Sequence, residues 1–175
     1  MYTIKAHPTL YNGRQYRSRL EARWAAFFDV LGWRHEYEPL DMDGWSPDFL
    51  LGDDVFVEVK PITEAEPDII KRLSQYHRPK LEILLVSIKP FYTPGSPISR
   101  SAIGWMTDMC YDEPWFEPAN VVHAEPEGGY DFCHAYGAYG GRMQGARCHK
   151  CYGVEMRDME RLWAQASNMV QWQKA

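Results

Sequence analysis

The sequence predicts an α/β protein in which a mixed central β-sheet is flanked by helices. Residues 55–60 alternate between valine and the set Phe56, Glu58 and Lys60, a period-two pattern typical of a strand with two different faces. Residues 81–88 are almost continuously apolar, which indicates a buried central strand. A helical pattern at residues 64–77 lies between these two strands. We therefore expect a right-handed parallel crossover from the first strand to the second.

The composition predicts one domain with a hydrophobic core. The chain has 175 residues, of which 45% are hydrophobic, and a chain of this size buries about 70% of the surface that it exposes when unfolded. No stretch is long and apolar enough for a membrane span, and no charged-then-apolar N-terminal segment predicts a signal peptide. We therefore expect a cytoplasmic protein without a membrane partner.

The net charge of −5 argues against a nucleic-acid-binding protein, but the charges are unevenly distributed. Residues 1–35 carry six Lys and Arg against two acids, whereas residues 36–60 carry one against eight. Residues 101–131 carry seven acids and no Lys or Arg. A protein whose acids gather at a metal site and in one further region can still present a basic face to phosphates.

The first helix is predicted to begin at Ser18 and to end at Gly32. Ser18 and Glu21 have the spacing of a capping box, in which the glutamate bonds back to the amide of the cap residue. Apolar residues recur at helical spacing within residues 18–32, at Leu20, Trp24, Phe27, Phe28 and Leu31. After this helix, a short strand is expected at residues 33–38 and a turn-rich link at 39–44. Four arginines lie near the N-terminus of this predicted helix, namely Arg14, Arg17, Arg19 and Arg23.

A β-hairpin is predicted over residues 46–60, with its turn at residues 52–54. Asp48 stands at the head of the first strand and Glu58 near the end of the second, so the two carboxylates are expected to meet across the hairpin beside Lys60. Carboxylates in this arrangement suit Mg²⁺, which takes one or two of them together with waters and phosphate oxygens. The alternative is that Glu58 and Lys60 form the solvated face of an amphipathic strand and that Asp48 caps a turn.

Residues 14–90 resemble the PD-(D/E)XK, or restriction-endonuclease-like, nucleases. Pro47-Asp48 followed by Glu58-Val59-Lys60 is similar to the signature of that superfamily. Several short sequence segments are similar to the endonuclease subunit of certain cut-and-paste transposons and to small nuclease-like proteins of actinobacterial phages. The segments that carry this likeness are Ser18-Arg19-Leu20-Glu21, Tyr37-Glu38-Pro39, Ser46-Pro47-Asp48-Phe49 and Val57-Glu58-Val59-Lys60-Pro61.

The resemblance implies a Mg²⁺- or Mn²⁺-dependent nuclease that hydrolyses phosphodiester bonds in DNA. Asp48 and Glu58 would hold the ion, helped by the Val59 carbonyl, while Lys60 would orient the attacking water or neutralise the developing charge. Glu21 stands where the family often places a further metal ligand, and capping remains the other explanation of this residue. The four arginines at the helix entry would then lie beside the phosphate and bind DNA.

Residues 1–90 are expected to form the nuclease core, and residues 91–175 an irregular extension packed on the core. We expect short strands or irregular structure at 101–131 and a closing helix at 155–172. Cys148 and Cys151 have the spacing of a zinc knuckle. A second knuckle would begin at Cys133 but has a tyrosine where its partner should stand, so the predicted Zn²⁺ site is Cys133, Cys148, Cys151 and His134, with His123 and Cys110 as other candidates for the fourth ligand. Ordinary thiols and histidines are the alternative.

The sequence therefore predicts a deoxyribonuclease with a restriction-endonuclease-like core. A nucleic-acid-binding or partner-binding phage protein that keeps this fold without cleaving is the rival hypothesis, and the acidic balance and the broken knuckle favour it. A homodimer is compatible with either. The sequence does not specify the structure of the DNA substrate or the position of the cut.

Overall fold

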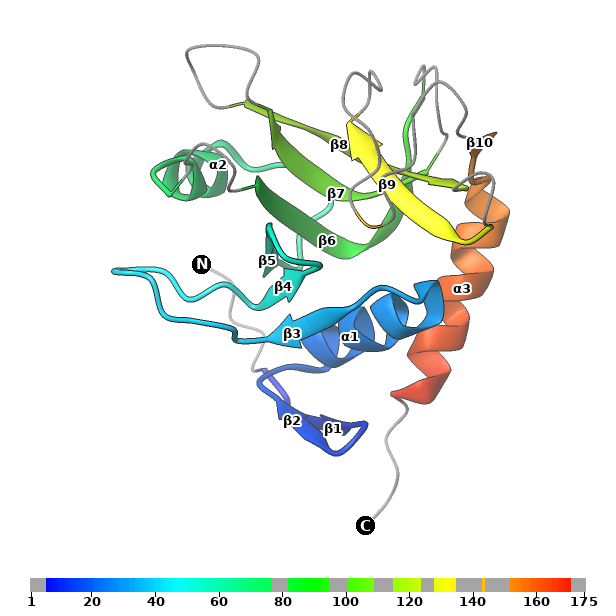
Figure 1. The fold of residues 1–175 in the computed structure, drawn as a ribbon, viewed down its shortest axis with the longest axis horizontal. Helices are drawn as coiled ribbons and strands as arrows, with labels where there is room; N and C mark the ends of the chain where they lie inside the picture. Colours follow the sequence, from blue (N-terminus) through cyan, green and yellow to red (C-terminus); the bar gives the residue numbers. More distant parts are fainter. Residues whose placement is uncertain are drawn as a thin grey trace.

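The computed structural model describes residues 6–76, 82–94, 101–108, 115–123, 128–134, 143 and 152–170, and shows a mixed α/β fold (Figure 1). Within these residues, eight strands form one mixed sheet and β1 and β2 form a separate hairpin. The sheet order is β10-β8-β7-β6-β5-β4-β3, with β9 also paired to β8. The predicted fold class is thus confirmed as α/β with a mixed central sheet.

The N-terminal elements follow the local signals of the sequence. β1 (Thr9–Tyr11) and β2 (Arg14–Tyr16) are antiparallel strands joined at Asn12 and Gly13, whose φ angles are 47° and 75°. Two residues with positive φ match the twist of a tight hairpin. Helix α1 (Arg19–Leu31) has Ser18 as its N-cap and Gly32, at φ 73°, as its left-handed C-cap, as predicted.

The middle of the chain contains the predicted order of helix, three strands, helix and strand. After α1 come β3 (His35–Tyr37), β4 (Phe49–Leu51), β5 (Val55–Val59), α2 (Pro67–Ser74) and β6 (Glu82–Tyr92). β3, β4 and β5 pair antiparallel, and β5 pairs parallel with β6. The predicted parallel connection through a helix is confirmed, although α2 is shorter than the predicted residues 64–77.

Two hydrophobic clusters cover the two faces of the sheet. The first cluster joins Val55, Val57 and Val59 to α1 and α3, and the second joins Ile83 and Leu85 to Leu73 of α2. Figure 1 shows α1 beside α3, which runs down the right of the view, and α2 apart from them at the left. The period-two alternation of β5 and β6 therefore divides each strand between the two clusters.

The chain after β6 is more regular than the sequence predicts. Its described part consists of β7 (Ser101–Asp108), β8 (Trp115–His123), β9 (Tyr130–His134), β10 (Tyr152–Gly153) and α3 (Met156–Met169). Of the two expectations for residues 101–131, short strands or irregular structure, the described residues show strands, and β7 pairs with β6 and extends the same sheet. The predicted boundary between residues 90 and 91 lies inside β6. A Cβ at Gly104 would lie 2.1 Å from the Leu85 carbonyl oxygen, so β7 approaches β6 closely at a residue without a side chain.

Helix α3 packs against α1 through aromatic rings. The Trp163 ring centroid lies 4.8 Å from that of Trp24 and 5.4 Å from that of Phe27. Met159, Leu162 and Ala166 of the same helix are buried in the first cluster, so the apolar stripe of the closing helix serves core packing. Among the described helices, none has the length and apolar character that crossing a bilayer requires.

Candidate active site

The pairing of β4 with β5 brings Asp48 beside the end of β5. The register runs from Leu51 opposite Val55 to Phe49 opposite Val57, and the Asp48 amide donates to the Val57 carbonyl over 2.8 Å. Asp48 therefore lies next to the segment of β5 that carries Glu58. Each residue is only 4% exposed. The charge of Glu58 raises the pKa of Asp48, so the two acids lie within electrostatic reach of each other.

Asp48 is held by one main-chain donor and one arginine. Its Oδ2 accepts from the Val59 amide over 2.7 Å, and its Oδ1 accepts from Nη2 of Arg17. Burial raises the pKa of Asp48 from 3.8 to about 7, and the nearby charge of Glu58 adds to this rise. The Val59 amide acts in the opposite direction because it stabilises the ionised carboxylate. Such a raised pKa in a buried acid is typical of functional sites.

Glu58 is held by three side chains on the α2 side of the sheet. Its Oε2 accepts from the Trp45 indole over 2.8 Å. Its Oε1 lies 2.5 Å from Nζ of Lys60 and 3.2 Å from Nη2 of Arg72. The predicted pairing of Glu58 with Lys60 is present, whereas Trp45 and Arg72 carry no local sequence signal because both reach Glu58 only through the tertiary fold.

Glu21 serves as a bonding partner of its own helix cap and of a buried tyrosine. The Ser18 hydroxyl accepts from the Glu21 amide over 3.1 Å and donates to Oε1 over 2.7 Å. The Tyr37 hydroxyl donates to Oε2 over 2.6 Å, and burial together with this bond raises the pKa of Tyr37. The Glu21 carboxylate thus bonds the hydroxyl of the cap residue, Ser18. The charge of Glu21 also raises the pKa of Asp48.

The four arginines predicted to bind DNA occupy different environments. Arg14 is exposed and donates to the Tyr37 carbonyl over 3.2 Å, and Arg19 is exposed on α1. Arg17 lies in the site, where Asp48, Glu21 and other acids outweigh the effect of burial and raise its pKa. Arg23 is half-buried, and within the described residues its Nε atom has no hydrogen-bond partner.

The oxygen atoms predicted to bind a metal already contact cationic nitrogen atoms. Asp48 Oδ1 contacts Arg17, Glu58 Oε1 contacts Lys60 and Arg72, and the Val59 carbonyl accepts from Nζ of Lys60 over 3.4 Å. These three oxygens are therefore directed at positions where a cation is favoured, and hard oxygen donors suit Mg²⁺. In the described part of the chain, no three His, Cys, Asp or Glu side chains converge closely enough to hold a metal without rearrangement.

Half of the predicted Zn²⁺ site lies outside the described residues. Cys133 is buried on β9, where it pairs in register with Asn120 of β8. His134 ends β9. Cys148 and Cys151 belong to the part of the chain that the structure does not describe, as does Cys110. The zinc site stays a prediction.

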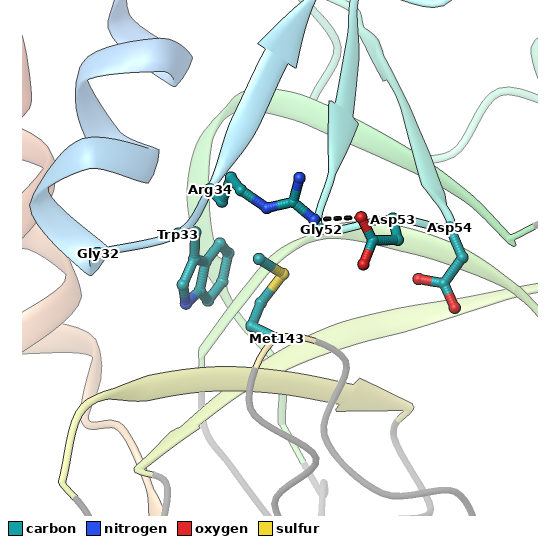
Figure 2. A pocket seen from close by; sticks show the side chains of 7 residues that line it. All are labelled: Gly32, Trp33, Arg34, Gly52, Asp53, Asp54 and Met143. Carbon is teal, nitrogen blue, oxygen red and sulfur yellow. Dashed lines mark hydrogen bonds and ion pairs between the residues drawn. The ribbon is translucent and has the colours of Figure 1, made fainter.

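A separate concavity of about 400 Å³ lies at the turn end of the β4–β5 hairpin (Figure 2). The ion pair between Arg34 and Asp53 crosses its rim, with side chains 70% and 88% exposed. Trp33 and Met143 form another wall. Because Asp48 and Glu58 stand at the opposite end of the hairpin, this concavity is not part of the candidate site. It does provide a matched surface ion pair for control experiments.

Comparisons with known protein families, with curated proteins and with solved structures find no match to this chain. Function is therefore inferred from the candidate site.

Proposed function

We propose that the protein is a metal-dependent deoxyribonuclease. The observation that carries this proposal is the presence of two buried acids, Asp48 and Glu58, within electrostatic reach of each other in one hairpin, with Lys60 beside Glu58. Burying two carboxylates together is costly unless cations compensate them. A site that binds and uses a divalent cation explains why the chain places them there.

The architecture around the site supports the restriction-endonuclease-like fold. The order α1, β3, β4, β5, α2, β6, with antiparallel β3-β4-β5 and parallel β5-β6, is the arrangement that the sequence resemblance implies for the nuclease core. Fold alone does not establish an activity. Asp48 immediately precedes β4 and Lys60 immediately follows β5, so both side chains and Glu58 of β5 would be available to one phosphate.

The residues of the chain have distinct parts in the proposed reaction. Asp48, Glu58 and the Val59 carbonyl would bind Mg²⁺, which supplies polarisation of the phosphate and a nucleophile derived from water. Lys60 would donate to the attacking water or to the charge that develops on the phosphate. Glu21 would keep the first turn of α1 and Tyr37 in place. The exposed Arg14 and Arg19 would contact the DNA backbone.

A magnesium-dependent nicking assay on supercoiled plasmid and on single-stranded, branched and linear DNA tests this function. The wild type should cleave at least one of these substrates with Mg²⁺ or Mn²⁺ and none with EDTA. Lys60→Ala should abolish cleavage, whereas Lys71→Ala, which removes an exposed lysine from α2, should leave it near the wild-type level. Equal cleavage by the Lys60→Ala variant would exclude the proposed site.

One observation favours a second candidate function. Both acids have cationic partners of their own, Arg17 for Asp48 and Lys60 with Arg72 for Glu58, so the network can also exist as a structural one. The protein would then bind nucleic acid or a partner protein without cleaving. DNA binding that is independent of divalent cations, together with no nicking under any condition, would support this alternative.

A further inference from the structure

The Arg17 guanidinium lies among three carboxylates that come from three different segments. Nη2 contacts Oδ1 of Asp48, while Nε lies 3.0 Å from Oε1 of Glu38 and 3.7 Å from Oε2 of Glu21. The main chain at Arg17 is anchored separately, because its amide donates to the Tyr37 hydroxyl over 3.0 Å. The head group can therefore move while the start of α1 stays in place.

Asp48 and Arg17 differ in how firmly they are held. The Asp48 side chain is 6% exposed and bonded to the main chain of β5, so its oxygen atoms have a fixed direction. The Arg17 side chain is 55% exposed, and Glu38, which it also contacts, is 43% exposed. Movement of the guanidinium into solvent would break the partly exposed pair with Glu38, which contributes little free energy, and would leave the hydrophobic clusters intact. The buried Asp48 carboxylate would then need the incoming metal ion as its compensating charge.

We propose that Arg17 is an internal competitor of the metal ion, which must leave Asp48 before a divalent cation binds there. This inference rests on the proposed nuclease function. A divalent ion bound to Oδ1 of Asp48 would lie within contact distance of the guanidinium in a mostly buried site, where the repulsion between them is weakly screened. The apparent metal affinity of the free protein is therefore reduced by the fraction of molecules in which Arg17 occupies Asp48.

The chemistry of the guanidinium also indicates what would draw it away. A phosphate accepts two parallel hydrogen bonds from an arginine, and such charge-assisted pairs are among the stronger ones in proteins. A DNA phosphate beside the site would compete with Asp48 for Arg17 and so expose Oδ1 to the metal. Binding of DNA and binding of metal then favour each other by the same factor. The free protein would hold little metal, and cleavage would begin only on the substrate.

Calorimetric titration with Mn²⁺ at pH 8, in the absence of DNA, tests this competition. Arg17→Ala should bind Mn²⁺ about tenfold more tightly than the wild type, within the usual range of coupling between sites. Arg34→Ala is the matched control, because it removes an exposed arginine paired with an aspartate at the far end of the same hairpin. It should leave Mn²⁺ affinity unchanged. Arg17→Met, which keeps the aliphatic stem, replaces the alanine variant if that variant melts early.

A short DNA duplex adds the second half of the test. It should raise the Mn²⁺ affinity of the wild type and have little effect on that of the Arg17→Ala variant. If Arg17→Ala and wild type bind Mn²⁺ equally, the competition does not occur, while Lys60-dependent cleavage would still uphold the nuclease. If no variant binds Mn²⁺ with or without DNA and none cleaves, both the competition and the proposed function are excluded.

Discussion

The two sides of the candidate site hold their carboxylates in different ways. On the α1 side, Asp48 is fixed by a main-chain amide of β5 and by the single guanidinium of Arg17. On the α2 side, Glu58 is fixed by Trp45, Lys60 and Arg72, which are side chains from three separate segments. The first arrangement follows from strand register, and the second depends on the packing of the whole face.

This difference determines how each side should respond to substitution. A carboxylate oriented by the backbone keeps its position when one neighbour is lost, so its function should fail only when the carboxylate itself is changed. A carboxylate oriented by side chains should lose its position by degrees as each donor is removed, as is usual for the groups that support metal ligands.

Asp48→Asn should have the largest effect. Asparagine retains an oxygen for the Val59 amide but removes the negative charge that would hold the ion, so cleavage should fall by about 100- to 1,000-fold. Plasmid nicking under single-turnover conditions measures this loss, and circular dichroism and melting should stay near wild type.

Asp53→Asn is the control for this substitution. Asp53 lies in the turn of the same hairpin, is 88% exposed and pairs with Arg34. Cleavage by this variant should stay near the wild-type level. Full activity of the Asp48→Asn variant would remove Asp48 from the catalytic site.

The burial of Asp48 should also make stability depend on pH. Its pKa is about 7 in the folded protein and is expected to be near 3.8 in the unfolded chain. Between these values the folded state retains a proton that the unfolded state has lost, so the free energy of unfolding should fall as pH rises, by at most about 1.4 kcal/mol per pH unit. The favourable contribution is complete below pH 4 and is lost towards pH 7.

Urea unfolding at pH 4.5 and 6.5 with EDTA present measures this slope. Asp48→Asn has no titrating group at this position, so its stability should fall less than that of the wild type over the same interval. Parallel stability profiles for the two proteins would show that Asp48 titrates normally and that its burial has no energetic consequence.

Trp45→Phe should have a smaller effect, on the α2 side alone. Phenylalanine keeps the ring but removes the N–H that donates to Glu58 Oε2, and we expect about a tenfold loss of Mn²⁺ affinity. Trp33→Phe removes a comparable buried indole donor, which bonds the Tyr130 carbonyl. That variant should bind Mn²⁺ as the wild type does. Equal losses in both variants would indicate a general effect on the fold.

The sequence predicted the α1 side and the hairpin well because their signals are local. Ser18 and Gly32 mark the ends of α1, and the turn length together with the period-two pattern determines which residues face each other in β4 and β5. The position of Asp48 beside the end of β5, where Glu58 lies, follows from that pairing. These features depend on residues close together in the chain.

The α2 side and the later strands could not be read in the same way. In the sequence, Arg72 has the pattern of an exposed helix residue, and only the tertiary fold brings its side chain to Glu58. β8 contains Pro118, which argues against a strand inside a sheet. The structure accommodates it where the pairing of β7 and β8 shifts register between Ala102 and Trp105. Such contacts arise only when distant segments pack together.

The most direct test of the account is whether Asp48 and Glu58 together bind one divalent cation. Electron paramagnetic resonance can count bound Mn²⁺ in the presence of a short DNA duplex, for the wild type and for the folded Asp48→Asn/Glu58→Gln variant. The account predicts one bound ion per chain in the wild type and none at this site in the variant. The same number of bound ions with the same affinity in both proteins would contradict it.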